Sequence, residues 1–150
     1  MVRIRIQSTR LQQQLVDQGP AGVRWVEKTA SANTCDATNQ TLDTYNIAAT
    51  DEAGQFSCML DFNRDPTDGS AIAAPFQAGD TCTLIGEVSC DGTNWTQQVR
   101  VVYNAFGATD NLAPQPQDIY LTKSRRYGRW RVNGTNARTV GFITQTRSNK

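Results

Sequence analysis

The residue types that usually carry catalysis are scarce in this chain. It contains no histidine, so the commonest general base is missing and Ser-His-Asp and Cys-His catalysis are excluded. The glycines form neither a P-loop nor a G-x-G-x-x-G pattern. Asp43, Asp61 and Glu87 could converge as the carboxylate pair of a glycoside hydrolase, but solvated strand positions explain them better. We therefore predict a protein that is not an enzyme and binds no cofactor.

Oxygen-bearing side chains recur at alternate positions around Asp61, as the calcium ligands of an EF-hand loop do. The pattern comprises Asp61, Asn63, Asp65 and Asp68. Pro66 stands where such a loop needs glycine, and Ile72 stands where it needs a bidentate glutamate. The segment is better interpreted as an Asp-Pro turn, and we predict no metal site.

The four cysteines, Cys35, Cys58, Cys82 and Cys90, lack the Cys-x-x-Cys spacing of a zinc site. Cys82 and Cys90 lie on one predicted strand, which would separate their α-carbons by about 26 Å, beyond the roughly 7 Å that a disulfide allows. A disulfide from Cys35 to any of the other three stays open. Buried reduced thiols are favoured, since no export signal is evident.

The elements that must position these residues are strands, and the clearest are two that form a hairpin from Thr81 to Tyr103. Apolar and polar residues alternate on both sides of Asp91-Gly92-Thr93-Asn94, whose small polar residues favour a turn. A four-residue loop places Cys82 opposite Tyr103, Leu84 opposite Val101, Gly86 opposite Val99 and Cys90 opposite Trp95. One face of this hairpin is then almost entirely apolar.

The rest of the chain gives similar patterns. We predict strands at 2–7 and 23–28, a short helix at about 9–18, and a loop at 29–40. A second hairpin is predicted from 42–50 and 55–62, pairing Phe56 with Ala49, Cys58 with Ile47 and Leu60 with Tyr45. Strands at 119–123, 127–132 and 139–146 follow, the last two joined by an Asn133-Gly134 turn. Extended loops are predicted at about 63–79 and 107–118.

These elements predict a single β-rich domain over residues 1–150. Its fold class is mainly β, an antiparallel β-sandwich or jelly-roll-like barrel with one short N-terminal helix. No run of about 18 apolar residues is present, and the first residues alternate where a signal peptide would be continuously apolar. We therefore expect a soluble chain made in the cytoplasm, with no membrane partner.

Charge is distributed in blocks, although the net charge is only +1. Residues 1–28 carry five basic and two acidic side chains, residues 29–122 carry two basic and twelve acidic, and residues 123–150 carry eight basic and no acidic side chains. The blocks either neutralise one another within the domain or meet a neighbouring subunit or polyanion. The candidate partner-contact residues are Arg3, Arg5, Arg125, Arg126, Arg129, Arg131, Pro114 and Pro116.

Two further binding functions are alternatives. The segment 125–131 interleaves arginines with Tyr127 and Trp130, as single-stranded nucleic-acid surfaces do, but Trp130 is expected to point inward, so nucleic acid is a disfavoured partner. A carbohydrate-binding or adhesion module, such as a receptor-binding tail part, would use exposed aromatic side chains as a stacking platform. The aromatic candidates for this platform are Trp25, Trp95, Tyr103 and Trp130.

The turn Asp91-Gly92-Thr93-Asn94-Trp95, in a chain rich in Thr, Asn, Gln and Ala, resembles turns of small β-rich virion structural proteins of tailed bacteriophages. The resemblance covers five residues and carries over no functional residue. It implies a virion protein such as a capsid decoration (cement) protein or a tail component. Such a protein would form a small symmetric oligomer, for example a trimer, and contact a major capsid protein or another virion protein.

Overall fold

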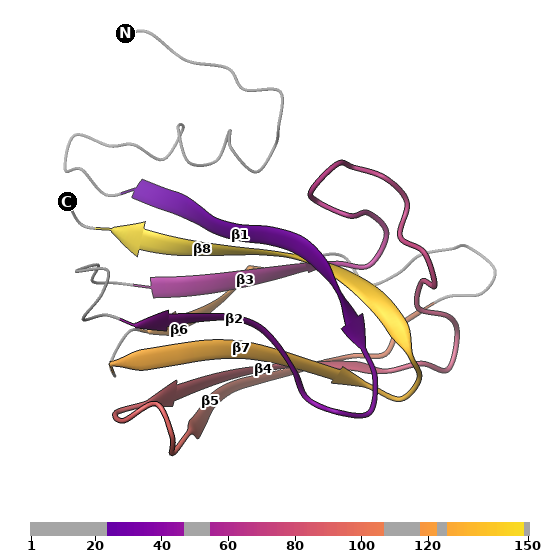
Figure 1. Ribbon diagram of the computed structural model, residues 1–150. Coiled ribbons are helices and arrows are strands. Elements are labelled where there is room, and N and C mark those ends of the chain that lie inside the picture. The colour runs from indigo at the N-terminus through magenta and orange to yellow at the C-terminus, as the bar shows by residue number, and fades with distance from the viewer. Residues whose placement is uncertain (1–23, 47–54, 107–117, 123–125, 149–150) are drawn as a thin grey trace, which may run out of the picture.

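The computed structural model describes residues 24–46, 55–106, 118–122 and 126–148, which form strands and connecting turns (Figure 1). The strands are β1 (Arg24–Cys35), β2 (Gln40–Asn46), β3 (Gln55–Asp61), β4 (Cys82–Ser89), β5 (Thr96–Tyr103), β6 (Asp118–Thr122), β7 (Tyr127–Gly134) and β8 (Arg138–Ser148). The described ranges contain no helix. The helix predicted at 9–18 and the strand predicted at 2–7 lie outside them.

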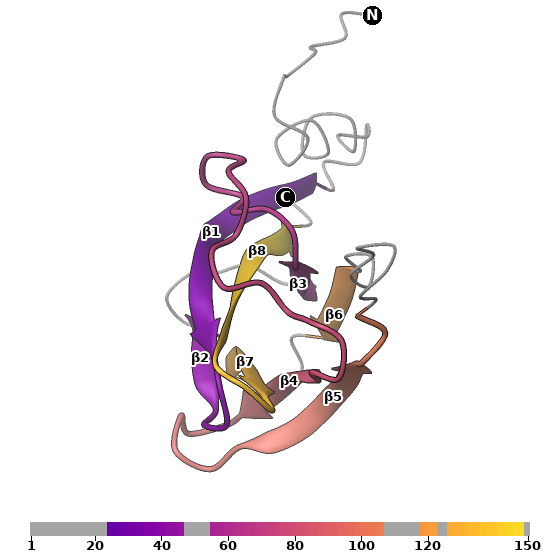
Figure 2. The same cartoon turned by 90° about the vertical axis from the view of Figure 1, so that its right-hand side faces the viewer.

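The strands form two four-stranded antiparallel sheets, ordered β1-β8-β3-β6 and β2-β7-β4-β5. Figures 1 and 2 show the two sheets as layers of a sandwich. Strands pair as β1 with β8, β2 with β7, β3 with β6 and β4 with β5, as if one long hairpin had been wrapped round the core. This pairing is the arrangement of a jelly roll. The predicted mainly β, sandwich-like class is confirmed.

The core lies between the sheets and consists of every second side chain of the inner strands. In β7 the alternation is complete, with Gly128, Trp130, Val132 and Gly134 buried and the residues between them partly exposed. Phe56 of β3 links the two layers, since its ring centroid lies 5.1 Å from that of Tyr45 in β2 and 6.3 Å from that of Trp130 in β7. The aromatic contacts join sheets that share no hydrogen-bonded strand pair.

The predicted hairpin from Thr81 to Tyr103 is confirmed for most of its length. Cys82 pairs with Tyr103, Leu84 with Val101 and Gly86 with Val99. The expected pairing of Cys90 with Trp95 is wrong, because the register shifts after Gly86 and Glu87 pairs with Gln97. A longer turn results, in which Asp91 Oδ1 accepts hydrogen bonds from the Thr93 and Asn94 amides, and Cys90 is exposed.

The predicted hairpin of 42–50 with 55–62 is wrong. β2 pairs with β7 in one sheet, whereas β3 pairs with β6 and β8 in the other. Tyr45 therefore meets Phe56 across the core, edge to face, and does not pair with Leu60. Alternation correctly predicted the inward residues, but it does not specify which strand lies alongside.

The predicted turn at Asn133-Gly134 is also wrong, because both residues belong to β7 and pair with Thr83 and Cys82. Position 134 requires glycine because neighbouring atoms leave no room for a side chain. A Cβ atom there would lie 2.9 Å from the Thr81 carbonyl oxygen and 3.0 Å from Cys35 Sγ. The chain then crosses between sheets, so β7 and β8 do not pair.

Two segments predicted as loops are more ordered than expected. The region 29–40 is mostly strand, since β1 continues to Cys35. The region 63–79 folds back on the sandwich and buries Ile72 and Phe76, with Arg64 bridged to Ala71. Phe76 stacks on Phe106 at 4.8 Å between ring centroids, so this loop closes one end of the core. The loop predicted at 107–118 lies outside the described residues, except for Asp118 in β6.

None of the described residues belongs to a helix with the length and hydropathy needed to cross a membrane.

The space beside Gly86 is filled by Trp130 and Leu121, and this contact gives the first prediction. A Cβ atom at Gly86 would lie 2.7 Å from Trp130 Cζ3 and 2.8 Å from Leu121 Cδ2. Gly86→Ala should therefore lower the free energy of unfolding in urea by about 1–3 kcal/mol, as overpacking does.

Trp130→Phe provides the matched background, because phenylalanine lacks the ring that carries Cζ3. In the Trp130→Phe protein, the loss in free energy of unfolding caused by Gly86→Ala should be smaller by at least about 0.5 kcal/mol. An equal cost in both backgrounds would mean that the Trp130 contact does not limit residue 86.

Candidate interaction surface

The outer face of the β2-β7-β4-β5 sheet carries two of the sequence-predicted basic residues, Arg129 and Arg131. Since Trp130 and Val132 point into the core, Arg129 and Arg131 project outward from β7. β4 runs alongside with Glu87 directly opposite Arg129. Arg129 Nε donates a hydrogen bond to Glu87 Oε1 at 2.7 Å, and Arg131 Nη1 donates to the same oxygen at 3.1 Å. One carboxylate thus holds two guanidinium groups.

Trp95 completes this cluster from the β4–β5 turn. The Arg129 guanidinium carbon lies 4.0 Å from the centroid of the Trp95 ring, a close cation–π contact. The side chains of Arg129, Arg131 and Glu87 are 20%, 19% and 14% exposed, so the group is fixed and partly covered. Arg129 is oriented by a carboxylate on one side and by an aromatic ring on the other.

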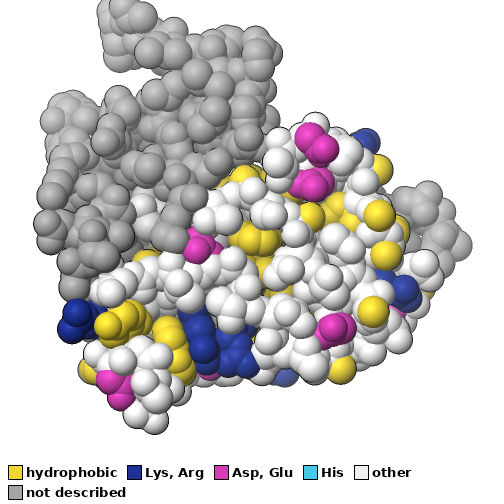
Figure 3. Space-filling model, in the orientation of Figure 1, with side chains coloured by type: hydrophobic (Ala, Val, Ile, Leu, Met, Phe, Trp, Pro, Cys, Tyr) yellow, Lys and Arg dark blue, Asp and Glu magenta, His cyan; other side chains and the backbone are white. Residues whose placement is uncertain are grey.

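The same face has an excess of positive charge. Arg100 of β5 is exposed and pairs across from Ile85, which also faces Arg131 of β7. Three arginines therefore stand near one glutamate. Figure 3 shows basic and hydrophobic side chains side by side on this part of the molecule, near the β4–β5 turn. We call Arg100, Arg129 and Arg131 the basic face.

The structure brings together only part of the predicted contact set. Arg126 is exposed, and its guanidinium carbon lies 5.4 Å from the centroid of the Tyr127 ring at the start of β7. Positions outside the described side chains are Arg3, Arg5, Arg125, Pro114 and Pro116. Glu87 and Trp95 were not predicted as members, because their place beside Arg129 depends on the β4–β7 pairing and on the longer turn.

The aromatic residues proposed as a stacking platform do not form one. Trp130 is fully buried and Tyr103 is 5% exposed, so their assignment to a platform is wrong. Trp95 is partly exposed, but one side of its ring is occupied by Arg129. The side chain of Trp25 lies outside the described set. In the described part of segment 125–131, Trp130 points into the core, whereas Tyr127 lies on the same outward side of β7 as Arg129 and Arg131.

The carboxylates considered for catalysis or calcium binding serve local structure. Asp61 Oδ1 accepts hydrogen bonds from the Asn63 and Arg64 amides, and Asp43 Oδ2 accepts one from Thr144 Oγ1 at 2.6 Å. Asp65 Oδ1 accepts from the Thr67 amide and Asp68 Oδ1 from the Ser70 amide. Among the described residues, no three cysteine or acidic side chains form a group that could hold a metal ion.

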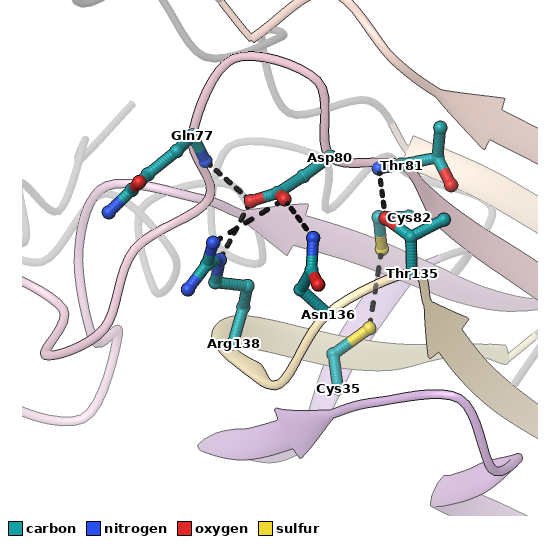
Figure 4. A network of polar contacts seen from close by, with 8 residues as sticks. All are labelled: Cys35, Gln77, Asp80, Thr81, Cys82, Thr135, Asn136 and Arg138. Carbon is teal, nitrogen blue, oxygen red and sulfur yellow. Dashed lines mark hydrogen bonds and ion pairs between the residues drawn. The ribbon is translucent and has the colours of Figure 1, made fainter.

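A second polar network, which we call the Asp80 clamp, lies at the other end of β4 (Figure 4). Asp80 is 2% exposed, and its Oδ2 accepts hydrogen bonds from Arg138 Nε and the Gln77 amide, both at 2.7 Å. Its Oδ1 accepts one from Asn136 Nδ2 at 2.7 Å. The hydrogen bond from Arg138, followed by those from the Gln77 amide and Asn136, lowers the pKa of Asp80 to about 2. The clamp ties the β3–β4 loop to the β7–β8 connection.

The comparisons with known proteins identify a similar fold. No family model matches this chain, and neither does any curated protein. Among solved structures, it is similar to a protein described in the words "Bacillus endospore appendages form a novel family of disulfide-linked pili". The two share 14% identity, and the TM-score is 0.50 over 84% of this chain and 87% of the other. The similarity is one of fold.

The shared carboxylate of the basic face should contribute to stability. Glu87→Gln leaves Arg129 and Arg131 without a negative partner, so we expect the free energy of unfolding in urea to fall by about 1 kcal/mol. The loss should shrink at high salt, because screening weakens the pairing in the parent protein. Arg100→Gln, an exposed change on the same face, should stay within about 0.5 kcal/mol of the parent. Equal losses for the two variants would contradict the role given to Glu87.

The Asp80 clamp should appear in the pH dependence of stability. Because the pKa of Asp80 is lowered from 3.8 to about 2 on folding, its ionised form stabilises the protein above about pH 4, and this stabilisation is lost as the pH falls towards 2. Asp80→Asn should cost about 2 kcal/mol at neutral pH, measured by urea unfolding. The difference between parent and variant should decline between about pH 4 and pH 2. A difference that stays constant across this range would mean that the Asp80 charge is not what stabilises the fold.

Proposed function

We propose that this chain is a non-enzymatic structural subunit that assembles with further copies of itself. The observation that carries the proposal is the fold similarity to a protein of endospore appendages, which are described as pili. The similarity extends over most of both chains, so it concerns the whole sandwich. On this proposal the outer surfaces of the sandwich perform the function, by contact with neighbouring subunits.

The use of the charged side chains supports this proposal. Asp61, Asp80 and Glu87 each accept hydrogen bonds that fix a turn, a loop connection or a pair of arginines. Carboxylates that accept such hydrogen bonds restrict the motion of the surface segments that donate them. A rigid surface loses little conformational freedom on binding, which favours a specific protein contact.

The arrangement of charge suggests how subunits meet. The basic face adjoins the β4–β5 turn, whereas Asp65 and Asp68 lie in the β3–β4 loop, beyond the opposite end of β4. Figure 3 shows acidic side chains on the projecting loop, with a basic side chain beside them, and a group of basic side chains towards the other end of the molecule, where acidic side chains also occur. A contact between the basic face of one subunit and the acidic loop of the next is head-to-tail, and repetition of such a contact builds a filament or a ring.

A bacteriophage capsid decoration protein is a more specific form of the same proposal. Its partners would be copies of itself, in a small oligomer such as a trimer, and a major capsid or other virion protein, and its location would be the virion. An appendage subunit would instead polymerise unaided. The two forms therefore differ in what the purified chain does by itself.

Assembly of the full chain tests the proposal. Sedimentation velocity over a roughly hundredfold concentration range, with electron microscopy of the same samples, should show species larger than a monomer. Filaments would favour an appendage subunit, and discrete oligomers that bind capsids would favour a decoration protein. A chain that stays monomeric at the highest concentration and binds no capsid would overturn the proposal.

Two charge variants test the head-to-tail contact separately. Arg100→Glu alters the basic face, and Asp68→Asn removes a charge from the acidic loop while keeping an oxygen that can accept from Ser70. Each should raise the concentration needed for assembly by roughly tenfold, more at low salt than at high salt. Thr34→Glu, an exposed change on β1 of the other sheet, is the control and should leave assembly unchanged. Assembly that responds only to Thr34→Glu would place the contact elsewhere.

A further inference from the structure

Two cysteines from different sheets meet inside the sandwich. Cys35 ends β1 and Cys82 begins β4, and their sulfur atoms lie 3.8 Å apart (Figure 4). Both side chains are completely buried, and the two residues are 47 positions apart in the chain. The structure holds both as free thiols. Such a contact needs only a small movement of the sulfurs to reach bonding distance.

We infer that Cys35 and Cys82 are the site of an internal disulfide that joins the two sheets. The inference is independent of the proposed function. The sequence left open a bridge from Cys35 to any of the other three cysteines, and the fold brings Cys82 into sulfur contact with Cys35. Cys90 is exposed at the far end of β4, whereas Cys58 is a third buried thiol, on β3.

Hydrogen bonds of the neighbouring backbone fix the positions of Cys35 and Cys82. The Gly134 amide donates a hydrogen bond to the carbonyl of Asp36, the residue after Cys35, and Gly134 is also the pairing partner of Cys82. On the other side, the Thr81 amide donates to Thr135 Oγ1, and the neighbouring Asp80 is fixed by its clamp. Backbone contacts therefore position both cysteines, so little conformational freedom remains to be lost when the bond forms.

Formation of the bond requires a two-electron oxidant. With a small-molecule disulfide such as oxidised glutathione, one cysteine thiolate attacks a glutathione sulfur and releases one glutathione thiol. The second cysteine then attacks the mixed disulfide and releases the other glutathione thiol, so two protein thiols become a disulfide as one molecule of oxidised glutathione is reduced to two thiols. The Cys35 thiol and burial both raise the pKa of Cys82, which suppresses its thiolate in the folded protein. Oxidation should therefore be much faster during folding than afterwards.

Peptide mapping of the unaltered full chain tests the inference. The denatured, reduced protein is refolded with a mixture of reduced and oxidised glutathione, free thiols are then alkylated, and the protein is cleaved with trypsin and a glutamate-specific protease. Cuts after Lys28, Glu52, Arg64, Glu87 and Arg100 place each cysteine on its own peptide. We expect residues 29–52 to be linked to residues 65–87, with the mass of two hydrogen atoms lost, and Cys58 and Cys90 to be alkylated. Alkylation of Cys35 and Cys82, or a link through Cys58 or Cys90, would overturn it.

Thermal unfolding with and without a reductant gives an independent readout. The bond closes a long loop between the sheets, so reduction of the refolded protein should lower the melting temperature by roughly 10 °C. Cys58→Ala and Cys90→Ala are matched controls and should keep this shift. Cys35→Ala and Cys82→Ala should lose it, whatever their own melting temperatures. A shift that survives in the Cys35→Ala protein would contradict the assignment.

Discussion

The packing of Trp130 against Gly86 is the contact on which the rest of the sandwich depends. Trp130 has no exposed surface, although the indole Nε1 has no hydrogen-bond partner among the described residues. Leaving that group unpaired costs about 1–3 kcal/mol, which dispersion contacts must offset. The ring fits because Gly86 lacks a side chain and because Leu121 and Phe56 of the other sheet approach it. One large and one small residue on adjacent strands thus set where the two sheets meet.

The same contact determines the outer surface. Once Trp130 points inward, the period of two in a strand forces Arg129 and Arg131 outward. The register that sets Gly86 opposite Trp130 also sets Glu87 opposite Arg129. A slip by one residue would bury the arginines and expose the tryptophan, so core packing and the charged surface specify the same register. The packing of the core therefore fixes the outward direction of Arg129 and Arg131.

The sequence predicted the faces of the strands far better than their neighbours. Alternation correctly assigned Trp130 inward and Arg129 outward, and the predicted β4–β5 pairing was correct from Cys82 as far as Gly86. Pairing between β2 and β7, or between β1 and β8, joins distant segments, and alternation carries no signal for it. Local turn patterns misled for the same reason: Asn133-Gly134 resembles a hairpin turn, yet Gly134 is a close-packing position in β7. The contacts of Glu87 and the meeting of Cys35 with Cys82 both depend on that long-range topology.

The two ends of β4 serve different purposes. At Cys82 the Asp80 clamp, the Thr81–Thr135 contact and the two thiols join the sheets, so the buried Asp80 and the polar groups around it are used for cohesion. At Ser89 the chain enters an exposed turn ordered by Asp91, which brings Trp95 under Arg129. A domain closed at one end can present a charged contact at the other without destabilising its core, because the two sets of interactions share no residue. This separation is compatible with the assembly proposed above, since contacts made at the surface then do not have to hold the fold together.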